Sequence, residues 1–345
     1  MKKLKIILPI VLLLIILLIL VSIKEKQLVE KPNIIQQDNI KLIEEPKKLI
    51  FDISNSDPDF KNYTETVDQL KEWDKESGEL TETGTYGQST SGKDLYYFRI
   101  KKSESNPKVF IHACIHGNEP LASSIVMHWI GQILSKYNVN EKVTDLIDSR
   151  ELIFIPVVSV DSYPKSRYVD RVDPNRNFPS KRRPDLISVK PIEELKKFFV
   201  KEKPQAVISG HTWGRVFLIP WGESNSPCEN FTDYKKIIGD ITTSPYNFKT
   251  FCQIEDIPQQ TRVSFGGNMS ELSGYGVLQT SKVYNHPIYG SEVDWYYRNG
   301  AFSIVIEFGD HQRIPTHEEI KIESDKTFDA MLLFLEKAPL VKIKL

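Results

Sequence analysis

Apolar residues recur along the chain at two spacings, and these spacings predict most of its secondary structure. Val67, Leu70 and Trp73 lie three residues apart, as on one face of a helix at 63–73. Nearly continuous apolar runs at 108–111, 152–158, 206–209 and 301–308 are typical of buried strands. We expect further strands within 85–100, around a turn at 89–92, and further helices at 121–134, 191–200 and 328–335.

The order of these elements predicts the fold class. Apolar strands that alternate with helices are typical of an α/β protein whose sheet is covered by helices on both faces. Residues 222–285 carry many polar, glycine and proline positions and show neither spacing clearly. We therefore expect substrate-facing loops in that region.

The N-terminus has a different pattern. Residues 1–5 are basic, and residues 6–23 are apolar apart from Pro9 and Ser22, a length at the short end of the roughly 17–25 residues that span a bilayer. A signal-peptide core is the alternative, but no small-residue cleavage signal precedes Lys24, which favours an uncleaved signal anchor. We expect an anchor at 1–23, a polar spacer at 24–58 and an exported catalytic domain at 59–340.

Composition and charge limit the classes of protein to which the chain could belong. The 345 residues are 40% hydrophobic and 26% charged, enough for one large α/β domain or two small ones. A formal net charge of -1 gives no electrostatic case for binding nucleic acid. Three cysteines without Cys-x-x-Cys spacing argue against a disulfide scaffold or a thiolate zinc site, although Cys228 and Cys252 could pair in an exported domain.

Three distant segments supply the residue types that a zinc hydrolase needs. His116 and Glu119 follow one predicted strand, His211 follows another, and Glu307 lies near the end of a third. Because sites in open α/β sheets lie beyond the carboxyl ends of the strands, these side chains are expected to meet. Two histidines and one carboxylate form a three-ligand zinc site with an open position for water, and a further buried glutamate is the natural base. The polar cluster at 173–178 is able to grip a carboxylate.

These motifs together resemble the zinc carboxypeptidase family, the carboxypeptidase A-like metallopeptidases. The resemblance runs from about residue 63 to residue 335 and rests on the segments 86–95, 116–119, 173–178, 211–214, 219–222 and 290–295, in that order. It implies a mixed, mostly parallel twisted sheet and one zinc ion per chain, held by His116, Glu119 and His211. It also implies hydrolysis of a C-terminal peptide bond by zinc-activated water, with Glu307 as general base.

The resemblance also implies roles for the residues around the metal. Asp173 is similar to the carboxylate that orients a zinc-bound histidine. Asn175 and Arg176 are similar to the pair that binds the terminal carboxylate of the substrate, where a guanidinium can make two hydrogen bonds. Arg167 is preferred to Arg171 as the arginine that stabilises the oxyanion.

The sequence departs from the family pattern at one position. The place of the family's mobile tyrosine is taken by His286, so His286 itself or the flanking Tyr284 or Tyr289 could supply the hydrogen bond. Val293, just before an Asp-Trp pair, argues against a preference for basic C-terminal residues.

Two alternatives to the carboxypeptidase remain. A related zinc amide hydrolase, acting on peptidoglycan stem peptides or acylated amino acids, would share the zinc core. A binding protein with an inert site is disfavoured because all three ligands and Glu307 are present. The expected partner is therefore a peptide or peptidoglycan peptide with a free C-terminal carboxylate.

Overall fold

The computed structural model describes residues 59–241, 267–283 and 286–345. The expected anchor and spacer, together with Cys252 and Tyr284, lie outside the described residues. Within those three ranges, none of the helices combines the length and the apolar character needed to cross a membrane.

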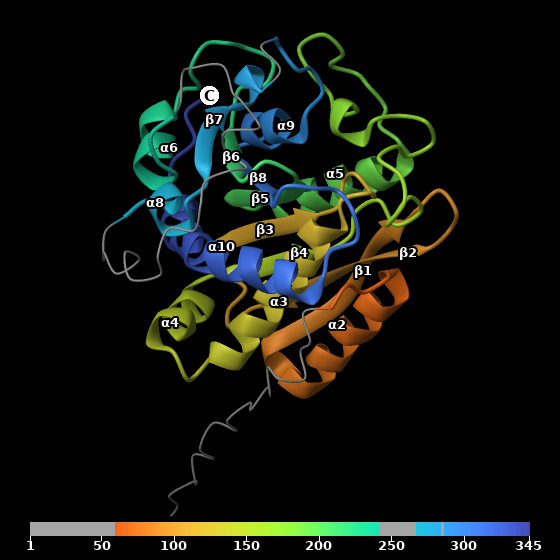
Figure 1. Cartoon of the computed structure of the whole chain (residues 1–345), viewed down its shortest axis with the longest axis vertical. Helices are drawn as coiled ribbons and strands as arrows, with labels where there is room; N and C mark the ends of the chain where they lie inside the picture. The colour runs from red at the N-terminus through yellow and green to blue at the C-terminus, as the bar shows by residue number, and fades with distance from the viewer. Residues whose placement is uncertain (1–58, 242–266, 284–285) are drawn as a thin grey trace, which may run out of the picture. The chain divides into compact units, whose positions relative to one another are not determined.

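One sheet holds all the named strands, in the order β1-β2-β4-β3-β5-β8-β6-β7 (Figure 1). The strands are β1 (Thr81–Gln88), β2 (Asp94–Ile100), β3 (Lys108–Ala113), β4 (Glu151–Ile155), β5 (Ala206–Thr212), β6 (Val216–Ile219), β7 (Gly276–Gln279) and β8 (Phe302–Phe308). The central neighbours β4, β3, β5 and β8 pair in parallel, as do β6 and β7. The pairs β1–β2, β2–β4 and β6–β8 are antiparallel, so the sheet is mixed and mostly parallel, as predicted.

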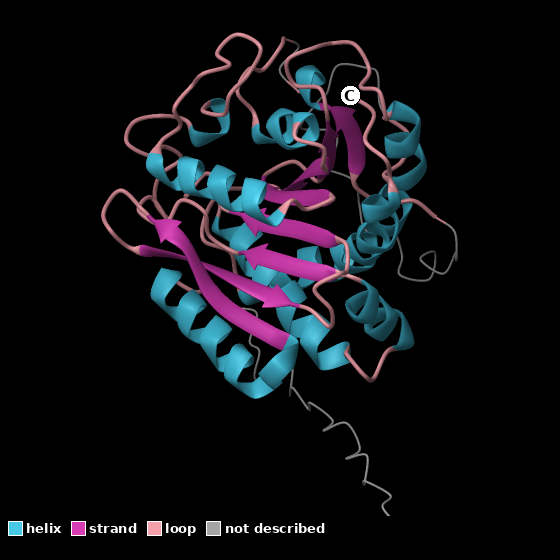
Figure 2. Cartoon of the chain, turned by 180° about the vertical axis from the view of Figure 1, so that it is seen from behind, coloured by secondary structure: helices cyan, strands magenta, loops and turns pink. Residues whose placement is uncertain are grey.

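Helices pack on both faces of this sheet (Figure 2). They are α2 (Tyr63–Ser77), α3 (Pro120–Lys136), α4 (Glu141–Ser149), α5 (Lys190–Glu202), α6 (Phe231–Ile237), α8 (Met269–Ser273), α9 (Glu292–Arg298) and α10 (His317–Lys337). Buried residues of α2, α3, α4, α6 and α10 belong to one hydrophobic cluster, and those of α5, with Trp295 and Tyr296 of α9, belong to another. The predicted α/β architecture with two covered faces is therefore confirmed.

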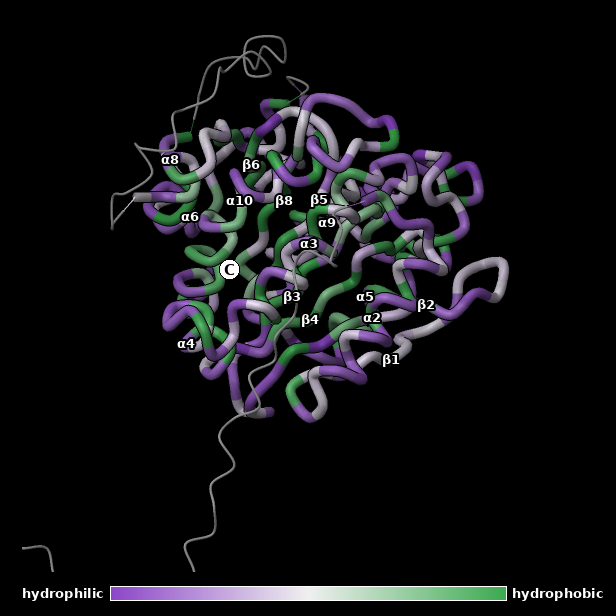
Figure 3. Tube along the Cα trace, turned by 60° about the horizontal axis from the view of Figure 1, so that its bottom comes forward, coloured by the Kyte–Doolittle hydropathy of each residue, from purple (hydrophilic) through white to green (hydrophobic). Residues whose placement is uncertain are grey.

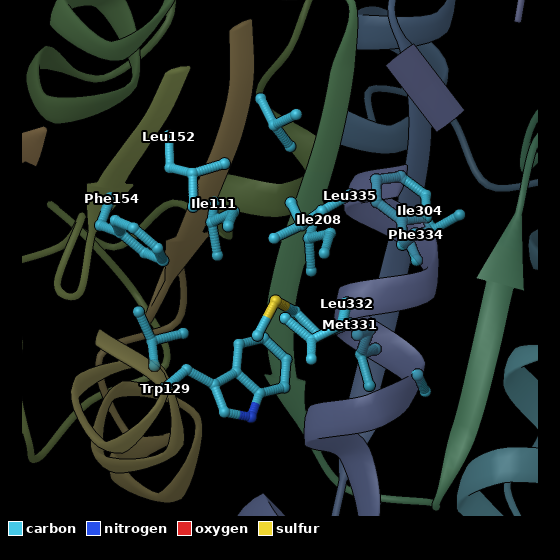
Figure 4. Packing of buried hydrophobic residues seen from close by; sticks show 14 of the residues in the cluster. Ile111, Trp129, Leu152, Phe154, Ile208, Ile304, Met331, Leu332, Phe334 and Leu335 are labelled. Atoms are coloured by element: carbon cyan, nitrogen blue, oxygen red, sulfur yellow. The ribbon is translucent and has the colours of Figure 1, made fainter. Parts of the chain in front are cut away.

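The strands feed both clusters because successive side chains alternate between the faces of a sheet. In β5, Ala206 and Ile208 belong to the cluster under α3 and α10, whereas Val207 belongs to the cluster under α5. Trp129 of α3, Met331 of α10 and Ile208 meet on the first face (Figure 4). The central strands are accordingly among the most hydrophobic segments of the chain (Figure 3).

The prediction of loops at 222–285 is wrong in part, because α6, α8 and β7 lie there. The missed strand β7 has only four residues, all buried, beside the equally short β6. An element of that length cannot establish a period in the sequence, and its pairing partner decides its structure. The structure also adds α4 and α9, which the apolar pattern did not predict.

The topology brings the candidate site together. Strands β3, β5 and β8 are adjacent and parallel, so the residues that follow or end them share one edge of the sheet. His211 of β5 is the register partner of Glu307 of β8, and side chains at paired positions of parallel strands point to the same face. His116 and Glu119 lie between β3 and the first turn of α3.

Candidate active site

His116, Glu119 and His211 converge on one point. The Nδ1 atom of His116 lies 2.9 Å from Oε1 of Glu119, and the Nδ1 atom of His211 lies 2.9 Å from Oε2 of the same carboxylate. All three side chains are buried, and their candidate ligand atoms lie within 4.8 Å of one another. Two imidazole nitrogens and a carboxylate that face each other at this range match the donor set of a zinc site.

The charge distribution also favours a cation at this point. His211 lies between two buried carboxylates, Glu119 and Glu292, whose side chains are 1% and 0% exposed. Although burial opposes it, the attraction of both carboxylates raises the pKa of His211 well above its ordinary value. Buried carboxylates need a nearby positive charge, and a divalent ion held by the same nitrogens would supply it.

Asp173 and Arg167 adjoin the metal ligands. Oδ1 of Asp173 lies 3.1 Å from Nε2 of His116, the ring nitrogen opposite the one that faces Glu119. Oδ2 of Asp173 accepts hydrogen bonds from Nε and Nη2 of Arg167, at 3.1 and 2.9 Å. Burial raises the pKa of Asp173, but the hydrogen bond to His116 and the charge of Arg167 outweigh it and lower the pKa overall.

A cavity of about 390 Å³ opens beside this cluster. Its polar lining comprises His116, Glu119, Arg167, Asn175, Arg176, His211, Thr212, Thr280, Ser291, Glu307 and Gln312, with Trp213 beside them. Its apolar lining comprises Val216, Leu218, Val283, Ile288, Val293 and Val305. A mostly apolar pocket with a few convergent polar groups is the usual form of a small-ligand site.

Glu307 faces this cavity from β8. Desolvation of its carboxyl group, reinforced by the nearby charge of Glu119 and opposed by that of His211, raises the pKa of Glu307 to about 7. A bound metal ion would lower that pKa, because its positive charge favours the carboxylate. In the metal-free site, the carboxyl group of Glu307 is therefore more basic than that of an ordinary glutamate.

Asn175 and Arg176 are presented by a short turn that Asp173 initiates. The carboxylate of Asp173 accepts a hydrogen bond from the backbone N–H of Asn175 at 3.0 Å. Gly290, at φ +77°, packs against this turn, and a Cβ atom there would lie 2.6 Å from the carbonyl oxygen of Arg176. This position thus requires glycine both for its backbone conformation and for the close approach.

The structure does not bring every predicted residue to the cavity. His286 is exposed, with its Nδ1 atom 3.1 Å from the carbonyl oxygen of Pro287. Tyr289 lies beneath the guanidinium of Arg182, which is 3.7 Å from the ring centroid. Neither side chain lines the cavity, whereas Arg167 does and Arg171 does not.

Two residues at the site escaped the sequence analysis. Glu292 lies with Oε1 2.5 Å from Nε2 of His211, and Nε2 of Gln312 donates to Oε1 of Glu119 at 3.1 Å. Glu292 lies inside the motif at 290–295, but that motif gives no indication of a contact with His211. Gln312 follows β8 in a polar segment, where no spacing distinguishes it from its neighbours.

The family model described as zinc carboxypeptidase matches residues 66–330, most of the chain and within the predicted domain at 59–340. The chain belongs to the zinc carboxypeptidase family. Zinc is the metal of this family, and His116, Glu119 and His211 form a possible site for it.

Curated relatives are similar over part of their length. Carboxypeptidase D of Mus musculus is 24% identical over 264 residues, which cover 70% of this chain and 18% of that protein. Carboxypeptidase O of Bos taurus is 22% identical over 183 residues, which cover 42% of this chain and 48% of that protein. The match therefore spans less than half the length of either relative.

Solved structures share the fold. The crystal structure of thrombin activatable fibrinolysis inhibitor aligns with a TM-score of 0.67 at 16% identity, covering 83% of this chain and 76% of that one. Carboxypeptidase A from Helicoverpa armigera aligns with a TM-score of 0.62 at 17% identity, covering 82% and 74%. At these identities the alignments establish the fold alone.

Proposed function

We propose that this chain is a zinc carboxypeptidase that removes the C-terminal residue of peptides, with Glu307 as the general base. One observation carries the proposal. A single cavity joins the cluster of His116, Glu119 and His211 to Glu307 on one side and to Arg176 on another. These residues would supply the metal ligands, the base and the carboxylate receptor that the proposed reaction needs, within reach of one small ligand.

The chain's own residues account for the proton transfers. Zinc, when bound, supplies a Lewis acid that acidifies water and polarises the scissile carbonyl. Glu307 takes a proton from the attacking water and delivers it to the leaving amine, and desolvation of its carboxyl group favours the uptake of that proton. Arg167, whose guanidinium lies 3.9 Å from Oε1 of Glu119, stabilises the negative charge that develops on the carbonyl oxygen.

Arg176 and Asn175 would hold the terminal carboxylate of the substrate. Arg176 lines the cavity, and its Nη1 atom donates to the carbonyl oxygen of Asn175 at 2.7 Å, which orients the guanidinium. A planar guanidinium recognises a carboxylate through two charge-assisted hydrogen bonds. Binding at this point places the last peptide bond, rather than an internal bond, near Glu307.

The apolar residues of the cavity suggest the side chain that is removed. Val293 and five other apolar residues line the cavity, and five of these six belong to or pack against one hydrophobic cluster, which gives the cavity an apolar wall. We propose a preference for apolar over basic C-terminal residues. Contacts of His286 and Tyr289 with the substrate, and export of the domain, stay predictions.

The decisive experiment compares peptides that differ only at the C-terminus. Peptides ending in a free Leu should exceed their amidated twins by well over tenfold in kcat/KM, because an amide leaves Arg176 without its charged partner. Peptides ending in Lys should be cleaved more slowly. Arg176→Ala should abolish most of the discrimination against amides, whereas Arg171→Ala, in an arginine outside the cavity, should retain it.

Cleavage that ignores amidation would contradict the carboxylate receptor. It would favour the alternative of a zinc amide hydrolase, for which muropeptides and acylated amino acids are the substrates to assay beside the peptides.

A further inference from the structure

Behind the metal cluster lies a carboxylate that does not reach the cavity. Glu292, the first residue of α9, is fully buried, and its Oε1 atom lies 2.5 Å from Nε2 of His211. The same oxygen accepts a hydrogen bond from the Ser209 hydroxyl at 2.8 Å and one from Nδ2 of Asn175 at 3.3 Å. Three polar groups from two segments, β5 and the turn at 174–176, therefore converge on one oxygen atom.

This contact decides which nitrogen of the His211 imidazole carries the proton. Nδ1 of His211 points at Glu119, and Nε2 is the nitrogen that meets Glu292. A carboxylate at Nε2 keeps the proton on that nitrogen, so the lone pair of Nδ1 is directed at the position where the metal would bind. Asp173 makes the equivalent contact with Nε2 of His116. Each histidine of the cluster thus has its own carboxylate.

Within the part of the chain that the structure describes, the other oxygen of Glu292 faces a histidine ring rather than a lysine or arginine. Oε2 lies 3.6 Å from Nε2 of His112, a buried ring that is hydrogen-bonded to the Tyr296 hydroxyl at 3.0 Å. Burial lowers the pKa of His112 to about 4, so this ring is neutral at physiological pH. A buried carboxylate needs a nearby positive charge, and an ion bound by His211 would supply it.

Asn175 ties this carboxylate to the substrate end of the cavity. Its Oδ1 atom accepts the backbone N–H of Glu292 at 2.9 Å, while its Nδ2 atom donates to the carboxylate of the same residue. The two residues therefore hold each other through both ends of one amide group. Arg176 follows directly in the chain, so the support of His211 and the carboxylate receptor share this pair.

We propose that Glu292 is a positioning residue that orients His211 for zinc and anchors Asn175 beside Arg176. The inference rests on the proposed zinc site. It adds a second carboxylate–histidine pair to the pair formed by Asp173 and His116.

The test measures zinc alone, by competition with a chromogenic chelator, on the full chain. Glu292→Gln keeps the size of the side chain and removes its charge, and we expect zinc to bind about 10–100-fold more weakly, as for comparable partners of metal ligands. Glu323→Gln is the matched control. Glu323 is also buried, accepts from Arg215 at 2.6 Å and lies in α10, and it belongs neither to the metal cluster nor to the cavity lining.

Thermal unfolding of the metal-free variants separates positioning from general destabilisation. We expect Glu323→Gln to unfold more readily yet to bind zinc with unchanged affinity. If Glu292→Gln fails to fold, Ser209→Ala, which removes one donor to the same oxygen, should weaken zinc binding several-fold. A zinc affinity within twofold of the wild type in the folded variant overturns the inference. Absence of zinc binding by the wild type would instead overturn the proposed function.

Discussion

At the level of single residues, the cavity places two glutamates in opposite environments. Glu119 contacts both histidines of the cluster, accepts from Gln312 and accepts the backbone N–H of Thr212 at 3.2 Å. Desolvation raises the pKa of Glu119, but the two histidines outweigh this effect and lower the pKa overall, to about 2. The pKa of Glu307 is instead raised to about 7. Such a separation fits the roles that we propose for them, Glu119 as metal ligand and Glu307 as base.

Glu307→Gln tests this assignment. The amide has the same shape but cannot accept a proton from water, so we expect kcat/KM for a free peptide to fall by roughly 10²–10⁴-fold. Zinc content, measured by metal analysis, should stay at one ion per chain. Activity within a few-fold of the wild type would show that another group is the base.

At the level of elements, α10 shows what the sequence could predict and what the apolar pattern left out. The predicted helix at 328–335 is observed, but the helix begins at His317. The first residues of α10 are largely polar, and the sequence signal for the start of this helix is a capping box. The Thr316 hydroxyl accepts from the backbone N–H of Glu319, and the Glu319 carboxylate accepts from the backbone N–H of Thr316 at 2.8 Å.

This capping box yields a stability prediction. Thr316→Ala should lower the free energy of unfolding by about 0.5–2 kcal/mol, measured by denaturant titration.

Burial raises the pKa of Glu319, but hydrogen bonds from Thr316 and Arg313 outweigh it and lower the pKa from 4.5 to about 2. A lowered carboxyl pKa stabilises the fold above pH 4.5, and this contribution is lost as the pH falls towards 2. The deficit of Glu319→Gln should therefore be present at pH 7 and vanish near pH 2; a deficit independent of pH would contradict it.

The site shows the same division between what the sequence predicts and what it leaves out. His116, Glu119, His211 and Glu307 could be predicted because each follows or ends a long apolar strand, and adjacent parallel strands deliver such residues to one edge. Glu292 could not, since its role depends on α9, a seven-residue helix without a readable period that packs against β8. Short elements depend on tertiary contacts, so the residues they carry become visible only in the folded chain.

At the level of the whole molecule, the candidate metal site is built from separate parts of the domain. His116 follows β3, Glu119 precedes the first turn of α3, and His211 lies in β5. Behind them, Asp173 and Glu292 connect the loop before α5 and the start of α9 to the same histidines. Because the unfolded chain holds no such preformed site, binding of zinc is linked to folding of the domain.

This linkage predicts how metal removal changes stability. Free zinc at about 1,000 times its dissociation constant should raise the free energy of unfolding by about 4 kcal/mol relative to the metal-free protein, if the unfolded chain binds none. A chelator should therefore lower the Tm of the wild type in calorimetry, and restored zinc should raise it again. His211→Ala loses one of three ligands, so its Tm should hardly respond to either treatment. An equal response of wild type and variant would place the stabilising zinc elsewhere on the molecule.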